Sequence, residues 1–510
     1  MNCSLTLVLS LGLAAASHAA VLRGMVVEAQ TGRPLARALI VVQPVSGGKG
    51  ATQSLRTNPN GVFEFPPMPA GAYLITASRR AFAPVQYGQK GWKSSGVPVV
   101  LEEARETNLR IALPRYGAIT GRIVDENDVG LPEHDVIAYR NARPPVMVGK
   151  ASTDDRGVYR IFGLEPGAYM IRSATKMYDD GGYLPTFYKD ATTADGARPV
   201  EVVLDQDVPD ITVRPTPGCL YSLGGSIYNP GGGRAPLTVT LVSDMGSESV
   251  STDANGRYKF SPVAPGKYEL YAQAQGGRTQ GAMAAFQPVE IDRDQSDLNF
   301  SLRPQPEVQF AFEDPKGAPF DSSSVQVLAR QKQLSGEGAA QFLSLTDNRH
   351  TFAPGRWEFS LPPNYAFYVA AFRGPNRETR AGERADGWNE VVLTQSALVK
   401  FVLSGNPAAV HGAVTNAARD PVAGVPVYLE PYDAEGRRRA GDLRMVRTDV
   451  QGQFRFTGLA PGAYRLLGTF EFQMPDASTM DAAGALVIRA EEGAELAQDV
   501  LQYVAATTHQ

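Results

Sequence analysis

One sequence pattern returns along the chain and constrains its fold more than any other feature. The pattern is a Thr, then Asp or Asn, a Gly three residues later, two aromatic or aliphatic residues at spacing two, and a closing Pro-Gly-x-Tyr. Clear copies begin at Thr57, Thr153, Thr252 and Thr448, and a degraded copy ends at Trp357. A motif that returns at the spacing of a small domain indicates a tandem array of about five units.

Each part of the motif has a structural role. In the second copy, Asp154 sits where a short acceptor side chain can bond the backbone N–H groups of a turn. Tyr159 and Ile161 alternate at period two and therefore lie on one face of a strand. Pro166-Gly167 is typical of a type II turn. Tyr169 resembles the tyrosine corner of Greek-key sandwiches, whose hydroxyl bonds nearby backbone. None of these groups is a reagent, so the motif indicates folding and not catalysis.

The motif and its surroundings resemble the carboxypeptidase regulatory-like domain. The resemblance rests on an opening Gly-x-Val or Gly-x-Ile, a following Pro, an apolar strand and then the motif, and it covers the chain after residue 20. It implies a transthyretin-like (prealbumin-like) β-sandwich. The segment 183–190 is similar to multi-copy secreted proteins of Gram-negative soil bacteria. In carboxypeptidases the domain is an accessory to a zinc peptidase domain, and it also occurs in outer-membrane receptors and surface proteins. The family motif has no catalytic residues to transfer.

The predicted fold class is therefore all-β: a tandem array of about five antiparallel Greek-key β-sandwiches, transthyretin-like or immunoglobulin-like, of roughly seven strands each. The chain has 51 Gly and 37 Pro in 510 residues, as many turns require. The predicted boundaries are a signal peptide at 1–20 and sandwiches at 21–114, 115–216, 217–304, 305–405 (divergent) and 406–510. Short Pro-containing links predict a rod or a gently bent string of sandwiches.

The N-terminus has the composition of a secretory signal. An uncharged apolar core at Leu5–Ala16 precedes small residues, so we expect cleavage near Ala19 or Ala20 and no transmembrane segment afterwards. Cleavage leaves Cys219 as the remaining cysteine, which excludes a disulfide within the mature chain and predicts a small buried apolar residue. The sequence thus predicts an exported protein that is periplasmic, outer-membrane-associated or extracellular.

The charge and the histidines argue against nucleic-acid binding and zinc catalysis. The 49 basic and 53 acidic residues are well mixed, and the formal net charge is −4. The chain therefore lacks the positive charge that would attract the phosphates of a nucleic acid. None of the five histidines has a Glu three or four residues later, as a zinc carboxypeptidase requires. We expect no catalytic residues, no metal and no cofactor. An enzyme would need a pocket that sets a carboxylate and a nucleophile beside His134, His350 or His411.

Aromatic residues gather in the segments that follow the fifth strand of the first two units. Loops concentrate binding function, and clustered aromatic rings suit sugars or a protein partner. Alternatively, these rings pack back onto their own sandwich and cap an edge. The candidate ligand-binding residues are Tyr87, Trp92, Tyr183, Phe187 and Tyr188.

Together these features predict an exported, non-enzymatic structural or interaction protein of the cell envelope, built from stiffly linked β-sandwich modules. Its partner would be an unknown envelope protein or polysaccharide. Two alternatives stay open: a carbohydrate-binding protein that uses the loop aromatics, or an accessory subunit of an envelope peptidase or transporter.

Overall fold

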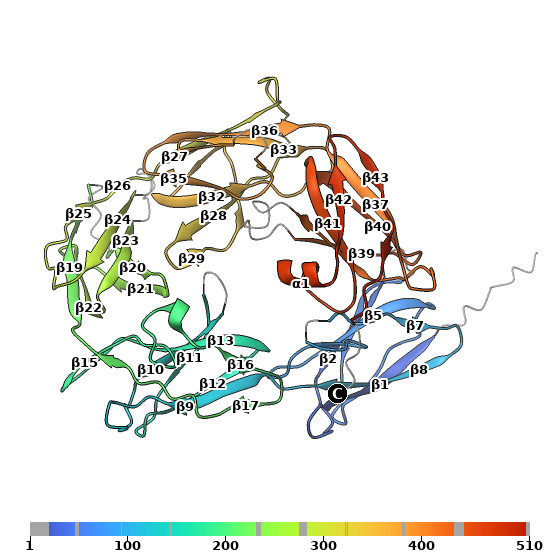
Figure 1. Cartoon of the computed structure of the whole chain (residues 1–510), viewed down its shortest axis with the longest axis horizontal. Helices are drawn as coiled ribbons and strands as arrows, with labels where there is room; N and C mark the ends of the chain where they lie inside the picture. Colours follow the sequence, from blue (N-terminus) through green and yellow to red (C-terminus); the bar gives the residue numbers. More distant parts are fainter. Residues whose placement is uncertain are drawn as a thin grey trace, which may run out of the picture.

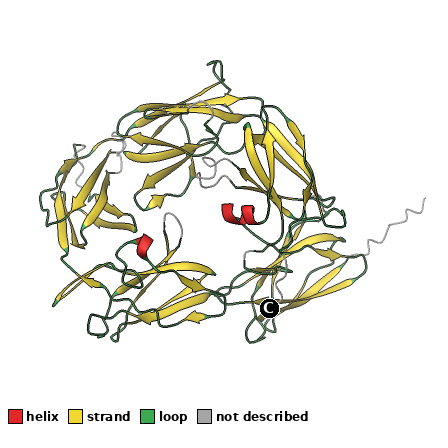
Figure 2. Cartoon of the chain, in the orientation of Figure 1, coloured by secondary structure: helices red, strands yellow, loops and turns green. Residues whose placement is uncertain are grey.

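The computed structural model describes residues 20–45, 50–92, 94–141, 145–230, 236–274, 283–321, 323, 325–379, 383–432 and 443–505. The predicted signal peptide lies outside these residues, apart from Ala20. The described chain is almost entirely β-strand, with the short helix α1 (Ala477–Ala482) and one 3-10 turn, Ala194–Gly196 (Figure 2). Its strands form facing pairs of sheets in five successive modules (Figure 1). The predicted class, an all-β tandem array of sandwiches, is confirmed.

Module 1 packs the sheet β4-β1-β8 against the sheet β3-β2-β5-β6, with β7 also paired to β5. Phe63, Phe65 and Tyr73 lie in the core between the two sheets. The strands are β1 (Val21–Glu28), β2 (Leu39–Pro44), β3 (Gln53–Arg56), β4 (Val62–Glu64), β5 (Gly71–Ser78), β6 (Val85–Gln86), β7 (Val99–Leu101) and β8 (Glu106–Leu113).

Module 2 packs β12-β9-β17 against β11-β10-β13-β16 and adds the small sheet β14-β15-β18. Tyr159, Ile161 and Tyr169 lie in its core. The strands are β9 (Gly117–Arg122), β10 (Asp135–Arg140), β11 (Val146–Ser152), β12 (Val158–Leu164), β13 (Gly167–Ser173), β14 (Lys176–Tyr178), β15 (Gly181–Leu184), β16 (Val200–Val202), β17 (Asp207–Val208) and β18 (Thr216–Pro217).

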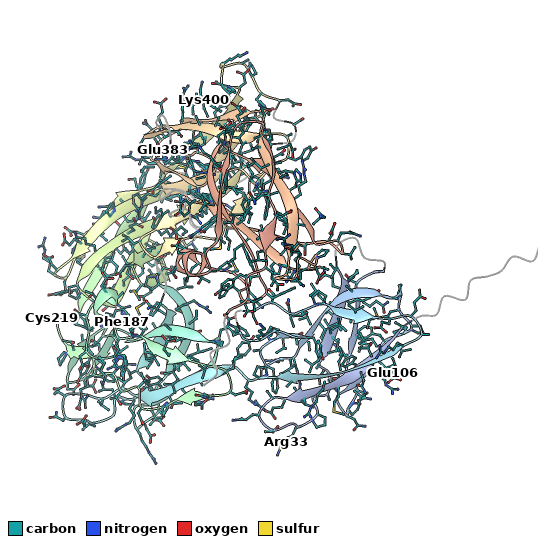
Figure 3. All side chains as sticks on the ribbon, turned by 45° about the vertical axis from the view of Figure 1, so that its right-hand side comes forward. Arg33, Glu106, Phe187, Cys219, Glu383 and Lys400 are labelled. Atoms are coloured by element: carbon teal, nitrogen blue, oxygen red, sulfur yellow. The ribbon has the colours of Figure 1, made fainter. Side chains whose placement is uncertain are left out.

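Module 3 packs β22-β19-β25 against β21-β20-β23-β24-β26. The strands are β19 (Tyr221–Tyr228), β20 (Thr238–Ser243), β21 (Gly246–Ser251), β22 (Arg257–Val263), β23 (Gly266–Ala274), β24 (Met283–Ile291), β25 (Phe300–Ser301) and β26 (Arg303–Pro304). Cys219, just before β19, is exposed, so the prediction that it is buried is wrong (Figure 3). The link that carries it runs along the surface between two cores.

Module 4, which lacks the full motif, keeps the two-sheet plan with β31-β27-β36-β33-β34 facing β29-β28-β32-β35, and β30 is also paired to β28. Phenylalanines dominate its core. The strands are β27 (Glu307–Glu313), β28 (Leu328–Gln333), β29 (Gly336–Glu337), β30 (Gln341–Phe342), β31 (Arg349–Thr351), β32 (Gly355–Ser360), β33 (Tyr368–Gly374), β34 (Arg377–Glu378), β35 (Asn389–Leu393) and β36 (Ala397–Ser404).

Module 5 packs β40-β37-β43, with β44 also paired to β37, against β39-β38-β41-β42. The helix α1 lies between β41 and β42 in the sequence. The strands are β37 (Ala408–Thr415), β38 (Pro426–Pro431), β39 (Arg444–Arg447), β40 (Gln453–Leu459), β41 (Gly462–Gly468), β42 (Leu486–Ala490), β43 (Glu495–Ala497) and β44 (Val500–Leu501).

Each module contains parallel pairing that an entirely antiparallel sandwich would lack. The first strand pairs in parallel with a strand near the module's end: β1 with β8, β9 with β17, β19 with β25, β27 with β36, and β37 with β43 and β44. Because the entering and leaving strands run in the same direction, the chain leaves a module at the end opposite to its entry. The modules are therefore strung end to end.

The repeated motif forms the turn that leads into the core strand. Thr153 Oγ1 accepts the N–H of His134 at 2.8 Å and donates to the Leu131 carbonyl at 2.6 Å. The Asp154 carboxylate accepts the backbone N–H of Val158 at 2.7 Å, and Gly157 has φ +75°. In the other clear copies, the side chains of Asn58, Asp253 and Asp449 likewise accept the backbone N–H four residues later. The predicted turn role of the motif is confirmed by these contacts.

The corner aromatic residue also has its predicted role. The Tyr169 hydroxyl donates to the Glu165 carbonyl at 2.6 Å, and Tyr73, Tyr268 and Tyr464 repeat the bond at 2.8 or 2.9 Å. In module 4, Trp357 replaces the tyrosine, and its indole N–H donates to the Ala353 carbonyl at 2.8 Å. Gly167 has φ +147°, more extended than the roughly +80° of a type II turn. The predicted turn type is thus wrong, although the positive φ is right.

The five modules form a closed ring, so the predicted rod or bent string is wrong (Figure 1). Hydrogen bonds and an ion pair join module 5 to module 1. The Ser95 N–H donates to the Phe470 carbonyl at 2.6 Å, and Gln473 Nε2 donates to the Ser94 carbonyl at 2.9 Å. Lys90 forms an ion pair with Glu471 at 2.8 Å. Short links allow a rod, but side-chain contacts between modules decide the curvature.

Candidate functional site

The candidate aromatic residues do not converge on one site. Tyr87 packs against the core of module 1, and Tyr183 and Tyr188 pack against the core of module 2. Tyr183 is 6% exposed. A ligand role for these three residues stays a prediction, and their side chains lie where the alternative interpretation expected them, against their own sandwiches.

The other two aromatic candidates lie where neighbouring modules meet. Phe187, labelled in Figure 3, is 1% exposed. It shares an apolar cluster with Tyr139 and Met170 of its own module and with Met245 of module 3. The half-buried Trp92 meets Tyr116 of the link to module 2 edge to face, with the ring centroids 6.4 Å apart. These rings thus contribute to the contacts that set the angles between modules.

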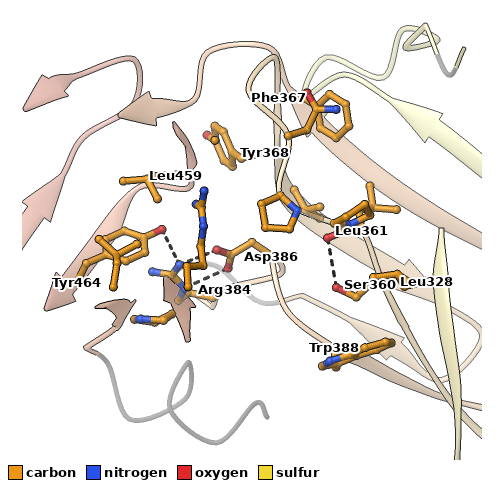
Figure 4. A pocket seen from close by; sticks show the side chains of 18 residues that line it. Leu328, Ser360, Leu361, Phe367, Tyr368, Arg384, Asp386, Trp388, Leu459 and Tyr464 are labelled. Atoms are coloured by element: carbon orange, nitrogen blue, oxygen red, sulfur yellow. Dashed lines mark hydrogen bonds and ion pairs between the residues drawn. The ribbon is translucent and has the colours of Figure 1, made fainter. Parts of the chain in front are cut away.

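A cavity of about 250 Å³ lies where modules 4 and 5 meet (Figure 4). Module 4 lines it with Tyr368 of β33 and with Arg384, Asp386 and Trp388 from the segment before β35. Module 5 lines it with the corner residue Tyr464 and with apolar side chains. The cavity thus combines aromatic walls with one buried pair of opposite charges.

Arg384 is the central polar group of this cavity. Its guanidinium binds Asp386 through two bonds, of 3.1 and 2.6 Å, and its Nη2 also donates to the Tyr464 hydroxyl at 2.7 Å. The Arg384 side chain is 8% exposed and lies 4.6 Å from the centroid of the Tyr464 ring. A bidentate pair of this kind is both strong and geometrically specific. Arg384 therefore ties module 4 to the corner of module 5.

Burial and charge shift the pKa values of these groups. Burial alone would lower the pKa of Arg384, but the Asp386 carboxylate and Tyr464 outweigh it, so that pKa is raised. Burial raises the pKa of Tyr464 to about 12. Burial lowers the pKa of Arg444, which also lines the cavity. At neutral pH Arg384 is therefore charged and Tyr464 is neutral.

Two local features position the cavity walls. The buried Asn389 side chain donates to the carbonyls of Ala385 and Gly387 at 2.9 Å each, which fixes the segment that carries Asp386 and Trp388. On module 5, Gly458 has φ +67°, and a Cβ there would overlap the Asn364 carbonyl oxygen.

Gly163 is the same motif position in module 2. Its φ is +78°, and a Cβ there would meet nothing within 4 Å. The close approach at Gly458 therefore belongs to the junction of modules 4 and 5, whereas the turn itself is shared.

The cavity suits binding more than bond-breaking chemistry. The Asp386 carboxylate is held by Arg384, and Arg384 is shared with Tyr464, so neither charge is placed as a general base beside a nucleophile. Aromatic walls and a polar pair are typical of sites for small polar ligands. Sequence reasoning missed this site because Arg384, Asp386 and Trp388 lie in the divergent unit, outside the repeated motif, and the cavity forms only where that unit meets module 5.

The histidines lie in separate settings. His134 is buried, with Nε2 2.9 Å from the Ala174 carbonyl and Nδ1 3.1 Å from the Tyr178 hydroxyl. His350 lies beside the Ser344 carbonyl at 3.2 Å. His411 lies 3.6 Å from Glu495, which also binds Arg455. Within the described ranges, no cluster of three or more His, Cys, Asp or Glu side chains could hold a metal ion.

The helices of the described chain include none whose length and apolarity would suffice to span a membrane.

Among curated proteins, the chain is 26% identical over 282 residues to a bone sialoprotein-binding protein of Staphylococcus aureus, covering 49% of this chain and 24% of that protein. A serine-aspartate repeat-containing protein E of S. aureus strain USA300 is 26% identical over 283 residues, with 49% and 24% covered. The chain thus spans about a quarter of the length of the curated relatives it matches.

Solved pilins also show some similarity. A minor pilin of Streptococcus agalactiae aligns with 39% of this chain and 97% of its own, at 14% identity and a TM-score of 0.25. The major pilin subunit of Bacillus cereus aligns with 76% of this chain and 99% of its own, at 11% identity and a TM-score of 0.15.

One protein family matches part of the chain directly. The carboxypeptidase regulatory-like domain family matches residues 21–114, the segment in which the sequence predicts such a domain. The motif of that segment returns in three further modules and, in degraded form, in module 4. The chain is therefore a tandem β-sandwich protein whose first module, residues 21–114, matches the carboxypeptidase regulatory-like domain family.

Proposed function

We propose that this protein is an exported, non-enzymatic structural and interaction protein of the cell envelope. Its five sandwiches would form one ring that holds binding surfaces at fixed positions. The observation that carries the proposal is ring closure, in which Ser95 and Gln473 join the two ends of the array by hydrogen bonds. A flexible tether between domains would not need such a contact, whereas a scaffold of defined geometry does.

The relatives support an interaction role at a surface. One is named for binding bone sialoprotein, and this fits a chain whose modules present loops and cavities to a partner. We also propose that the protein comes from a Gram-negative bacterium and lies in its envelope. The proposed domain boundaries are residues 21–114, 115–216, 217–304, 305–405 and 406–510. A role as an accessory subunit of an envelope peptidase or transporter is a variant of it, in which the partner is an enzyme or a channel.

Export and surface exposure can be tested in cells. The full chain, with its N-terminus intact and a C-terminal epitope tag, should appear in the envelope fraction or the medium and should have lost about 20 residues by mass. A matched variant with charged residues in place of Leu7 and Leu9 should stay in the cytoplasm at full mass. Recovery of the unaltered chain only in the cytoplasm would refute the proposed location.

A second candidate function is carbohydrate binding in the cavity between modules 4 and 5. Tyr368 and Trp388 supply aromatic faces, and Arg384 and Asp386 supply polar contacts, a combination that suits a sugar ring. The full chain should then be retarded on a polysaccharide column, and Trp388→Ala should abolish the retardation.

The exposed Tyr365 lies outside the cavity lining and gives a matched control. Tyr365→Ala should behave like the unaltered chain on the same column. If Trp92→Ala abolishes retardation and Trp388→Ala does not, the binding belongs to the loop aromatics instead. No retardation of the unaltered chain on any glycan tested would rule out both.

A further inference from the structure

Arginines gather in a second concavity, where module 1 meets the link to module 2. It has a volume of about 690 Å³ and is lined by Arg37, Arg56, Arg79 and Arg80, with Phe82 and Tyr116 at its wall. We call this concavity the arginine groove. None of its lining residues is acidic.

The sheet register brings the four arginines together. In the sheet β3-β2-β5, Leu39 pairs with Arg56 on one side and with Ser78 on the other. Arg37 precedes β2, and Arg79 and Arg80 follow β5, so all four lie at one end of the three adjacent strands. Neighbouring strands are about 4.8 Å apart, so the positive charges spread over a width of about 10 Å.

The charged side chains that line the arginine groove are all of one sign. In the described residues, none of its four arginines forms an ion pair with a carboxylate. By contrast, Arg115 at the edge of the groove is paired with Glu28 at 2.6 Å. A concave surface lined by one sign of charge focuses the potential and attracts a ligand of the opposite sign.

The wall of the groove is fixed by the junction between modules. Phe82 is 6% exposed, and the guanidinium groups of Arg79 and Arg115 lie 5.4 and 4.8 Å from its ring centroid. The Ala83 N–H donates to the carbonyl of Pro114 in the link at 2.9 Å. The wall of the groove is therefore fixed before a ligand binds, which lowers the free-energy cost of ordering the arginines around that ligand.

The shape and the spacing of charges select among anions. Charges spread over about 10 Å match several anionic groups repeated along a chain better than one phosphate. A flat membrane surface cannot enter a concavity, which disfavours lipid headgroups. Leu39 and Pro84 add apolar surface beside the guanidinium groups, as the C–H face of a sugar ring requires.

We propose that the arginine groove binds a segment of an acidic polysaccharide, with the arginines holding successive carboxylates. The inference deepens the proposed interaction function and rests on it. It assigns a ligand class and a site to the first two modules, separate from the cavity between modules 4 and 5.

The test uses the full chain in isothermal titration calorimetry at low salt. The probes are oligogalacturonate, an uncharged galactose oligomer of the same length, inorganic phosphate and hexaglutamate. Oligogalacturonate should bind, and its affinity should fall as salt rises, because exposed charges are screened. Arg56→Gln combined with Arg80→Gln should weaken binding by roughly tenfold or more, since each removes a charge-assisted contact.

The matched control is Arg33→Gln combined with Arg110→Gln, which removes the same charge from exposed positions of module 1 outside the groove lining. The control should bind like the unaltered chain. Equal weakening in both double variants, or equal binding of the uncharged oligomer, would overturn the proposal. So would binding of phosphate or hexaglutamate as tight as that of oligogalacturonate.

Failure of this proposal and failure of the proposed function give different results. A chain retained in the cytoplasm that still binds oligogalacturonate through the groove would contradict only the envelope role. An exported chain whose binding does not depend on Arg56 and Arg80 would contradict only the acidic-sugar site.

Discussion

The contact that closes the ring can be weakened without touching any module core. Lys90 is 62% exposed and Glu471 is 13% exposed, so their ion pair is worth about 0.2–1 kcal/mol. Lys90→Glu replaces this attraction with repulsion of similar size, a change of about 0.4–2 kcal/mol. Gln473→Ala removes a hydrogen bond to the carbonyl of the buried Ser94, about 1 kcal/mol. Together they should favour the open array by about 1.5–3 kcal/mol, a factor of roughly 10 to 150.

Hydrogen exchange at Ser95 measures this opening directly, because its N–H is bonded across the junction to Phe470. Exchange of the peptide that contains Ser95 should accelerate by roughly 10- to 150-fold in the double variant. Peptides from β1 should exchange at an unchanged rate. Small-angle scattering should show a larger radius of gyration wherever the open form is populated.

A charge swap gives the matched control for this experiment. Lys90→Glu combined with Glu471→Lys restores the opposite charges and should return exchange at Ser95 close to that of the unaltered chain. If Lys90→Glu with Gln473→Ala leaves exchange at Ser95 unchanged, these contacts do not close the ring in solution. The ring description would then be wrong.

Three further predictions follow from the modules themselves. Tyr169→Phe should lower the free energy of unfolding by about 1 kcal/mol because it removes one hydrogen bond, whereas Tyr464→Phe should lower it by about 2–3 kcal/mol because it also removes an acceptor of Arg384. Urea unfolding followed by fluorescence compares the two variants, and equal losses of stability would contradict the junction role of Tyr464. Gly163→Ala should lower the free energy of unfolding by about 1 kcal/mol through its positive φ alone, and Gly458→Ala should lower it clearly more, because its Cβ would also overlap the Asn364 carbonyl oxygen. Thermal melting compares the two variants, and equal shifts in melting temperature would show that the junction rearranges to accept the Cβ of Gly458→Ala. Burial lowers the pKa of His134, so the unfolded chain binds a proton there more readily than the folded chain. The stability that neutral His134 contributes should be full above the unfolded pKa of about 6.5 and fall as pH drops through it toward the folded pKa. His134→Gln should reduce the change in urea midpoint between pH 7.5 and 5, and an unchanged pH dependence would assign the effect to another group.

The fold within a module could be predicted from the sequence because the motif is local. Thr153, Asp154 and Tyr169 bond backbone within a few residues or across one hairpin, so their roles follow from residue type and spacing. Trp357 replaces the tyrosine O–H donor at the corner with its indole N–H, which explains how module 4 retains its fold despite the degraded motif.

The arrangement of the modules could not be predicted in the same way. Lys90 and Glu471 are 381 residues apart in the sequence, and nothing in the composition of either segment marks them as partners. The cavity at Arg384 likewise forms only when two modules meet. Phe187 shows the same limit: its aromatic character was recognised, but its contact with Met245 of the next module depends on the angle between the modules.

The parallel pairing of entering and leaving strands has a mechanical consequence. Tension applied along the chain pulls the first strand of a module and its parallel partner past each other, so it loads the hydrogen bonds of the pair together in shear. The β1–β8 pair has eight residues in register and β27–β36 has six, whereas β9–β17 and β19–β25 have two each. Forced unfolding is governed by the unfolding rate. Backbone bonds beyond these short pairs, such as Ile211 N–H to the Thr120 carbonyl and Leu298 N–H to the Gly224 carbonyl, also join the two segments. Under tension, modules 2 and 3 should therefore yield before modules 1 and 4, by a smaller margin than the paired strands alone indicate.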